Sequence, residues 1–487
     1  MRPRQQPKQD TAESTPPCAG ARPSSGGHTS PVPPSPTHDQ PPVPPCTQPN
    51  DLPRLSVPDR QLLLSPRIID DLLEDDHPAR AVWNYVLQLD LTALYDRIRA
   101  RGSVAGRPAI DPRLLVAVWL YATLSGFTSA RELAVLCSHY DPFIWLVGGV
   151  SVNYHTLADF RSDNPDLVER LLKQSVELLR QQGLIDLDRI AQDGVRVRAS
   201  AGAASFHRRQ TLEEQLQEAQ AERKRLRQEL AAKVADPTTT QGVATEQTAA
   251  EEPPSPQQQA AALRQAEERV ERVEQALERL PELEAKIKPG EHREARVSTT
   301  DPQATVMKMA DGGFRPAYNV EFATACDGQV IVGVDVVTVG SDQGQLPPMV
   351  DQVAGRFEQR PSEVLVDGGF AKREDIEAVQ AGGTCKVYAP VSKPKKDTVD
   401  RHEPKGTDSE EVAEWRQRMG TTKAKKIYKE RGATAECVNA QARNRGLRQL
   451  MVRGLEKVRT IAKWFAIAHN MARSFALQPQ PAFIDGS

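Results

Sequence analysis

The chain has 487 residues, of which 39% are hydrophobic and 26% are charged, and its formal net charge at pH 7 is -2. A chain of this length can bury two or more hydrophobic cores, and so balanced a charge does not point to any partner. No apolar run reaches the roughly 18 residues that span a membrane, and no apolar stretch follows the early arginines, as a secretory signal requires. We therefore expect a cytoplasmic protein.

Residues 1–60 are rich in proline, with fourteen prolines among the first 50 positions and almost no large apolar side chain. Such a segment buries too little surface to offset its backbone entropy. We expect a disordered leader. The six cysteines of the chain form no C-x-x-C pair, which argues against a structural zinc site and against a disulfide framework.

Residues 61–184 have helical periodicity. The spacing of apolar residues predicts helices over 112–124, 129–137, from about 153, and over 167–181. Two short helices across a glycine-containing turn are compatible with a helix-turn-helix, in which the third helix, carrying His155 and Arg161, would enter a DNA groove. A plain helical bundle with Tyr154 and Phe160 in its core is the alternative.

A strand is expected from Ile190 to Ala199, because apolar residues alternate with arginines from Asp193 onward. Asp193 shares the apolar face of this strand. Its carboxylate therefore needs compensation on burial, either hydrogen bonds from a capped turn or a bound cation. For a lone Asp-Gly pair the capped turn is the simpler interpretation.

Residues 207–290 differ in character, being rich in Glu, Gln, Arg and Ala. Apolar residues at 263, 266, 270, 273, 277 and 280 follow a heptad pattern, and residues 212–230 supply a partner segment. We expect an antiparallel coiled-coil hairpin inserted into the domain that follows. Its role would be that of a spacer, a dimer contact or an arm along DNA.

The strand pattern returns after residue 290. Residues 317–325 and 329–339 predict strands joined by an Asp-Gly turn, and a helix is expected over 346–357. Residues 364–370 predict a buried strand that ends in Asp367, followed by a helix over 372–380. Open α/β sheets bind ligands at the carboxyl ends of their strands. Asp193 and Asp367 are therefore candidates for one site.

Residues 416–453 contain eleven Lys or Arg but only two acids, Glu430 and Glu436. This surplus suits a bound polyanion. Glu436 lies on a helix expected over 433–442, where it is either a salt-bridge partner or a third carboxylate. Asp335 and Asp342 are rival acids for that third position. Two aspartates and a glutamate form an oxygen-ligand set suited to Mg²⁺ or Mn²⁺.

These motifs resemble those of the DDE transposases of bacterial insertion sequences. In the order of the chain, the matching stretches are Asp159-Phe160-Arg161, Ala191-Gln192-Asp193-Gly194, Ala317-Tyr318-Asn319, Val366-Asp367-Gly368-Gly369-Phe370, Tyr428 with Arg431, Glu436 and Arg443, and Ala468-His469-Asn470. Three departures stand out. Glu436 lies one residue further from Arg431 than is usual, Arg443 replaces a lysine, and Glu321 stands where a glutamine is usual.

The resemblance implies an α/β chain with a ribonuclease-H-like mixed sheet flanked by helices over 185–475. An all-α DNA-binding domain over 61–184 would precede it, the coiled-coil hairpin would be inserted in it, and residues 476–487 would form a tail. The implied catalytic and metal-binding acids, which would hold two Mg²⁺ or Mn²⁺ ions, are Asp193, Asp367 and Glu436. The side chains expected to contact DNA are Tyr428, Arg431, Arg443, Arg445, Arg161 and His155.

The implied activity is that of a transposase. Such a protein binds the terminal inverted repeats of its element, hydrolyses phosphodiester bonds at the ends and joins the 3'-OH to target DNA by metal-assisted transesterification. Its partners would be double-stranded DNA and further copies of the chain, as a homodimer or higher oligomer, at the bacterial nucleoid. The alternatives are a ribonuclease-H-like nuclease or resolvase without strand transfer, and an inactive DNA-binding descendant of a transposase.

Overall fold

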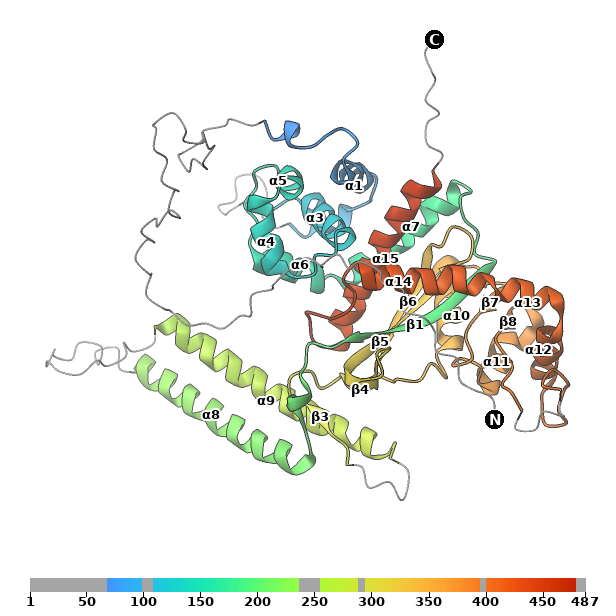
Figure 1. Cartoon of the computed structure of the whole chain (residues 1–487). Helices are drawn as coiled ribbons and strands as arrows, with labels where there is room; N and C mark the ends of the chain where they lie inside the picture. Colours follow the sequence, from blue (N-terminus) through green and yellow to red (C-terminus); the bar gives the residue numbers. More distant parts are fainter. Residues whose placement is uncertain (1–67, 99–107, 236–254, 288–293, 395–399, 479–487) are drawn as a thin grey trace, which may run out of the picture. The chain divides into compact units, whose positions relative to one another are not determined.

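The computed structural model describes residues 68–98, 108–235, 255–287, 294–394 and 400–478. The proline-rich leader expected over 1–60 lies outside these residues. The described residues all belong to one compact unit, Arg67–Ser487. This unit combines a mixed β-sheet with many helices (Figure 1).

The first part of this unit is helical, and its helix starts follow from the local sequence. Asp111 accepts a hydrogen bond from the Arg113 amide and Pro112 occupies the first turn, so that the capped chain enters a helix there. Ser129 and Asn153 cap two further helices in the same way. The helices are α1 (Pro78–Leu87), α2 (Thr92–Asp96), α3 (Pro112–Leu124), α4 (Ala130–His139), α5 (Asp141–Val147), α6 (Tyr154–Ser162) and α7 (Pro165–Gln181).

The sheet is built around β1 (Arg189–Arg198), which pairs antiparallel with β5 (Phe314–Ala325) and parallel with β7 (Glu363–Leu365). The far edge of β5 pairs with two shorter strands in succession, β4 (Thr305–Lys308) and β6 (Ile331–Val337). Beyond β7 the sheet ends with β8 (Lys386–Tyr388), also parallel. The strand predicted to run through Asp367 is therefore shorter than expected, because pairing stops at Leu365.

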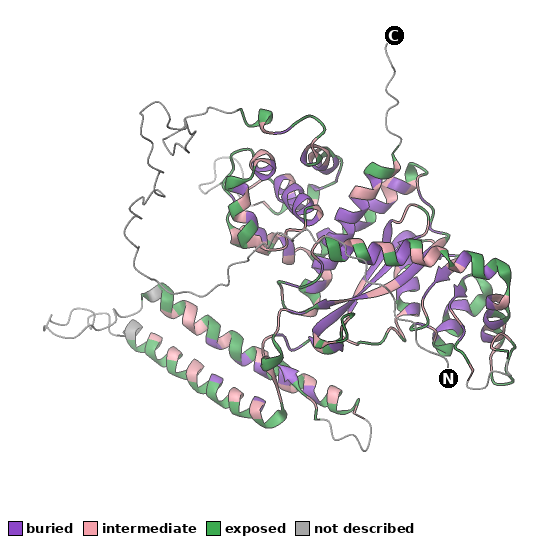
Figure 2. Cartoon of the chain, in the orientation of Figure 1, coloured by how far each residue is buried: buried purple, intermediate pink, exposed green. Residues whose placement is uncertain are grey.

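Two hydrophobic cores cover the two faces of the sheet. One core joins Val195 and Val197 of β1 to the N-terminal helices and to α15 (Leu455–Leu477). The other joins Ile190 and Val364 to helices on the opposite side. Those helices are α10 (Leu346–Phe357), α11 (Arg373–Gln380), α12 (Glu410–Gly420) and α13 (Thr422–Tyr428). Figure 2 shows the strands buried between these layers.

Helices α8 (Arg209–Ala235) and α9 (Pro256–Glu284) run alongside each other in opposite directions (Figure 1). Their direction follows from two ion pairs, because Arg209 meets Glu284 and Arg227, further along α8, meets Glu267, further back along α9. Apolar residues of the two helices form a small separate core. The expected helical segments are thus confirmed, and the coiled-coil supercoil stays a prediction.

A short antiparallel ladder joins the two ends of this helical segment. Strand β2 (Phe206–His207) precedes α8 and pairs with β3 (Val297–Ser298), which follows α9. Val297 is buried in the core of the helix pair. The segment before α8 and the segment after α9 therefore lie next to each other at the β2–β3 pair.

The last helix, α15, is joined to strand β6 by an ion pair between Arg459 and Asp335 and by the buried amide of Asn470. Asn470 accepts a hydrogen bond from the Ile331 N–H at 2.8 Å and donates one to the Ile331 carbonyl at 2.8 Å. Asn470 is fully buried and also donates to the Ser175 hydroxyl of α7 at 3.2 Å. This side chain thus connects the sheet, α7 and α15.

Every helix in the described part of the chain is too short or too polar to span a membrane.

Replacing Asn470 should destabilise the protein strongly. Asn470→Ala leaves the buried N–H and carbonyl of Ile331 without partners, at a cost of about 2 to 5 kcal/mol of unfolding free energy. Urea denaturation followed by circular dichroism measures this. The exposed Asn84 of α1 is the matched control, and its change to alanine should alter stability by less than about 0.5 kcal/mol. Equal effects of the two changes would contradict the role of Asn470.

Candidate active site

The parallel pairing of β1 and β7 brings two aspartates to the same level of the sheet. Ala191 of β1 is paired with Leu365 of β7, and Asp193 and Asp367 each lie two residues further along. Adjacent parallel strands keep their residues in step. Asp193, in the middle of β1, and Asp367, just after the end of β7, therefore lie on neighbouring segments, and the negative charge of Asp367 acts on Asp193.

A third aspartate, Asp342, reaches the same place from the loop that follows β6. Oxygens of Asp367 and Asp342 lie 2.9 and 3.1 Å from the point that a β-carbon on Gly369 would occupy. Any side chain at Gly369 would therefore press on both carboxylates, so glycine lets them approach each other. Asn319 of β5 donates a hydrogen bond of 2.8 Å to Asp342 and holds it in this position.

These acids line a cavity of about 680 Å³, called the carboxylate cavity below. Its remaining charged wall is mostly basic. Arg196 and Arg198 come from β1, and Arg196 is fixed by hydrogen bonds to the carbonyls of Lys308 and Gly340. The other arginines that line the cavity are Arg315, Arg443 and Arg448. A cavity with carboxylates at its centre and arginines around them suits a phosphate backbone held beside a cation.

Asp193 is held by neighbours on two sides. One oxygen accepts a hydrogen bond of 3.0 Å from the Gly194 amide, and the other accepts one of 3.1 Å from Asn439. Burial raises the pKa of Asp193 to about 6, Arg431 opposes this rise, and the charges of Asp367 and Asp342 add to it. The cost of keeping Asp193 ionised is thus set by desolvation and by its acidic neighbours.

The predicted third acid, Glu436, is separated from Asp193 by Arg431. The Arg431 guanidinium lies 2.6 Å from Glu436 and 3.6 Å from Asp193. The Glu436 side chain is 61% exposed, and Glu436 does not line the carboxylate cavity. Within the described ranges, no three His, Cys, Asp or Glu side chains converge as a ready metal site. The convergence of Asp193, Asp367 and Glu436 therefore stays a prediction.

The backbone around Glu436 is unusual. Residues Gly432–Glu436 form a π-helical turn between α13 and the helix α14 (Cys437–Asn444). Such turns contain one extra residue relative to an α-helix and occur often at functional sites. Glu436 lies one residue further from Arg431 than the family pattern has it, and the π-helical turn lies in this same interval.

Beneath the aspartates lies a second buried acid, Glu321 of β5. It accepts hydrogen bonds from Asn319 at 2.7 Å and from Gln192 at 3.4 Å. Burial raises the pKa of Glu321 to about 8, Asp342 adds to the rise, and the Gln192 hydrogen bond opposes it. A β-carbon on Gly194 would lie 2.7 Å from Glu321, so glycine is needed beside Asp193.

The side chains expected to contact DNA fall into two groups. Arg443 is exposed at the carboxylate cavity, and the Tyr428 ring lies under the Arg431 guanidinium at 5.9 Å. His155 is exposed on α6 and stacks on Tyr154, with ring centroids 4.0 Å apart. These positions are accessible to a ligand.

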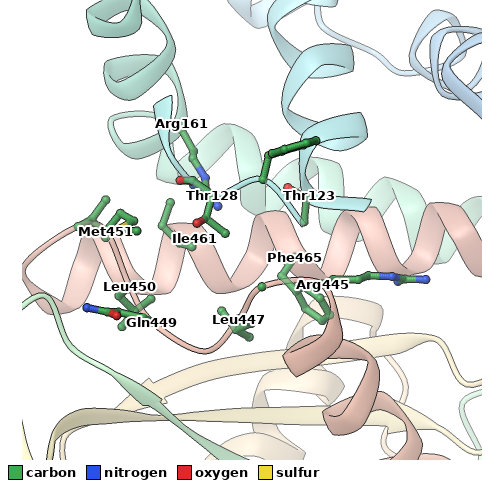
Figure 3. A pocket seen from close by; sticks show the side chains of 13 residues that line it. Thr123, Thr128, Arg161, Arg445, Leu447, Gln449, Leu450, Met451, Ile461 and Phe465 are labelled. Carbon is green, nitrogen blue, oxygen red and sulfur yellow. The ribbon is translucent and has the colours of Figure 1, made fainter. Parts of the chain in front are cut away.

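Arg161 and Arg445 lie among packed helices, and their contact with DNA stays a prediction. Arg161 is buried, its guanidinium lies 4.3 Å from the Trp119 ring centroid, and it donates a hydrogen bond to the Thr128 carbonyl. Arg445 is half-buried and lines a small pocket with Arg161, Thr123 and other residues of the N-terminal helices and α15 (Figure 3). Both arginines therefore contribute to packing between the N-terminal helices and the C-terminal part of the chain.

The arginines of the cavity wall include residues that sequence reasoning did not select, namely Arg196, Arg198, Arg315 and Arg448. The alternation on β1 was a usable signal, because it places Arg196 and Arg198 on the face opposite Val195 and Val197. No comparable signal exists for Arg315, which lies at the start of β5, or for Arg448, which lies in the loop after α14.

Two families of known proteins match the chain. Residues 67–163 match a transposase domain (DUF772), and residues 380–475 match the transposase DDE domain. The search of curated proteins and the search of solved structures each return no significant match. These two matches define the class of protein as a transposase with a DDE domain. The chain is a DDE transposase of the kind found in insertion sequences, as the sequence motifs predict.

The buried Glu321 should make stability depend on pH. Its native pKa of about 8 lies above its ordinary value of 4.5, so its contribution is fully present below pH 4.5 and is lost as the pH rises through 8. Glu321→Gln, which is always neutral, should remove this loss, which is at most about 1.4 kcal/mol per pH unit. The free energy of unfolding, measured with urea between pH 6.5 and 9, tests this prediction. This range lies above the pKa of Asp193, which is about 6.

The exposed Glu377 of α11 supplies the matched control, because Glu377→Gln removes an acid that lies in solvent. This control should keep the pH dependence of the wild type. If Glu321→Gln also followed the wild-type curve between pH 6.5 and 9, Glu321 would not be the group that titrates.

Proposed function

We propose that this chain binds the terminal inverted repeats of its element, hydrolyses phosphodiester bonds at the ends and joins the 3'-OH to target DNA by metal-assisted transesterification. The observation that carries the proposal is the meeting of Asp193 and Asp367 in a cavity walled by arginines. We further propose a ribonuclease-H-like catalytic domain. Its support is the mixed sheet, in which β1 pairs antiparallel with β5 and parallel with β7.

The donor set fits Mg²⁺ or Mn²⁺. Asp193, Asp342 and Asp367 present carboxylate oxygens to one cavity, and their mutual repulsion is relieved most directly by a cation. The proposed ligands are Asp193 and Asp367 with Glu436 as third acid, and two ions are proposed. Bound ions supply activation of the attacking oxygen and stabilisation of the leaving oxygen.

The rest of the chemistry is positioning by the chain itself. Asn439 orients Asp193, and Asn319 orients Asp342. Arg443 and Arg448 face the cavity from the C-terminal side and Arg196 from β1, so a DNA strand between them would have its phosphates neutralised. Arg431 offsets the charge of Asp193 and of Glu436 at the same time.

Glu436 and Asp342 compete for the role of third acid. Asp342 already lines the cavity, whereas Glu436 lies in the matched DDE domain and is paired with Arg431. We propose Glu436, on the reasoning that a bound phosphate gives Arg431 a new partner and releases Glu436 toward Asp193. Measuring DNA cleavage by the Glu436→Gln and Asp342→Asn variants distinguishes the two acids. Cleavage should be abolished in the variant whose neutralised acid is the metal ligand.

The partners proposed are the duplex ends of the element, target DNA and further copies of the chain bound to DNA. The proposed location is the cytoplasm, at the nucleoid. Incubating the protein with the element's own terminal DNA and a second duplex, with Mg²⁺, with Mn²⁺ or with EDTA, tests the whole proposal. Cleavage without joining would leave a nuclease or resolvase, and binding without cleavage would leave an inactive descendant of a transposase.

Asp193→Asn should abolish cleavage while DNA binding persists. The change removes one oxygen ligand and one charge but hardly alters shape, so cleavage should fall by more than about 100-fold. A gel assay of cleavage and an anisotropy assay of binding measure the two effects. Asp351→Asn, in an exposed residue of α10 outside the cavity, is the control. Equal loss of cleavage and binding by Asp193→Asn would assign Asp193 a structural role.

Arg443→Ala should weaken DNA binding at every sequence and reduce its salt dependence. Each lost phosphate contact lowers the slope of log K against log salt by about 0.9. Titrations of a labelled duplex at several KCl concentrations measure this slope. The control is Arg373→Ala, which removes an arginine of α11 outside the cavity. A slope equal to that of the wild type would show that Arg443 faces solvent in the complex.

A further inference from the structure

A second basic pocket lies at the base of the α8–α9 helix pair. It has a volume of about 290 Å³ and is lined by three arginines and two threonines among other residues. Arg269 and Arg272 come from α9, Thr299 and Thr300 follow β3, and Arg453 precedes α15. Among the described residues, no acid lines this pocket, which is called the arginine pocket below.

The walls of the arginine pocket are built by fixed backbone. The Ser298 hydroxyl accepts hydrogen bonds from the amides of Thr300 and Asp301, each at 3.1 Å. Asp301 is buried and accepts a hydrogen bond from the Gly454 amide, the residue after Arg453. One short segment thus holds both the threonines and Arg453. The pocket exists before any ligand arrives, which lowers the entropic cost of binding.

Arg453 interacts with the buried Asp301, whereas the other two arginines of the pocket have only exposed acidic partners. Arg269 lies 3.5 Å from Glu218, and Arg272 lies 3.4 Å from Glu268. The exposed fractions of these four side chains range from 32% to 69%. Exposed pairs of this kind contribute little to stability and are easily exchanged for another partner. An anion with several acceptor oxygens can replace them, because arginine binds phosphate through two parallel hydrogen bonds.

The position of the arginine pocket points to a DNA phosphate. Gln449 lines the carboxylate cavity and Arg453 lines the arginine pocket. Four residues of chain span at most about 14 Å, and each strand of a duplex rises about 3.4 Å per nucleotide. The backbones of Gln449 and Arg453, at the edges of the two sites, are therefore separated by no more than the rise of about four nucleotides along one strand.

We propose that the arginine pocket binds a backbone phosphate of the DNA whose scissile bond lies in the carboxylate cavity. The helix pair α8–α9 is then an arm that contacts DNA at its base. This inference rests on the proposed function, and it assigns a role to a segment that lies outside both matched families.

The test compares the salt dependence of DNA binding among variants of the full chain. The probe is a fluorescein-labelled duplex of about 30 base pairs, titrated at several KCl concentrations. The double variant Arg272→Ala/Arg453→Ala should lower the slope of log K against log salt by about 1 to 2 units. Arg225→Ala is the matched control, because Arg225 lies on α8 outside the pocket and pairs with Glu222 and Glu229. Its slope should equal that of the wild type.

A second measurement guards against a folding defect in the double variant. A single methylphosphonate linkage, which removes one phosphate charge, is moved along the duplex one position at a time. One position should weaken wild-type binding and leave the double variant unaffected. If no position behaved so, or if the double variant kept the wild-type slope, the inference would be overturned.

A third experiment distinguishes a DNA phosphate from free phosphate as the ligand of the arginine pocket. It also distinguishes failure of this inference from failure of the proposed function. Inorganic phosphate is titrated calorimetrically against the wild type and the double variant. Loss of phosphate binding with an unchanged DNA slope would make the pocket a site for free phosphate and overturn the DNA assignment. If the wild type bound no duplex at all, the proposed function itself would fail, whereas binding sensitive only to Arg443→Ala would overturn the further inference alone.

Discussion

The concentration of negative charge beside β1 is the constraint on which the rest of this structure depends. Asp193, Asp342 and Asp367 share one cavity, and Glu321 is buried beneath them. Each neighbour of these acids serves to make that charge tolerable. Arg431 offsets Asp193, amide groups hold the carboxylates, and proton uptake neutralises Glu321 up to a pH of about 8. Burial, together with this crowding of acids, raises the pKa of Asp193 to about 6.

The fold delivers this arrangement through pairing rather than through local sequence. The parallel register of β1 and β7 sets the level of two aspartates, and the pairing of β6 with β5 directs the following loop, with Asp342, to the same end of the sheet. Helix α15 keeps β6 in place through Asn470. The same helix packs on the N-terminal helices, and Trp464 donates a hydrogen bond to the Arg161 carbonyl. The site is thus supported by segments far away in the sequence.

The sequence alone predicts the elements well where capping and periodicity are strong, as in α3, α10 and the helices of the α8–α9 pair. It also selects Asp193, which shares the apolar face of an alternating strand, and Asp367, which ends an apolar run. The sequence alone could not show that Asp342, rather than Glu436, lies beside these two aspartates. Asp342 is in a loop, and only tertiary contacts determine where a loop residue lies. The burial of Arg161 against Trp119 was equally hidden, because helical spacing does not tell which face meets a second layer.

The β2–β3 ladder has a consequence for how this protein can vary. Strands β2 and β3, of two residues each, pair at the two ends of the α8–α9 segment. The length of that segment therefore does not affect the geometry of the main sheet. Adding or deleting matched turns in α8 and α9 changes only the reach of the arm, and loop-closure entropy grows slowly with length. Matched changes in the length of α8 and α9 would therefore alter this helix pair without altering the pairing of β1 with β5 and β7.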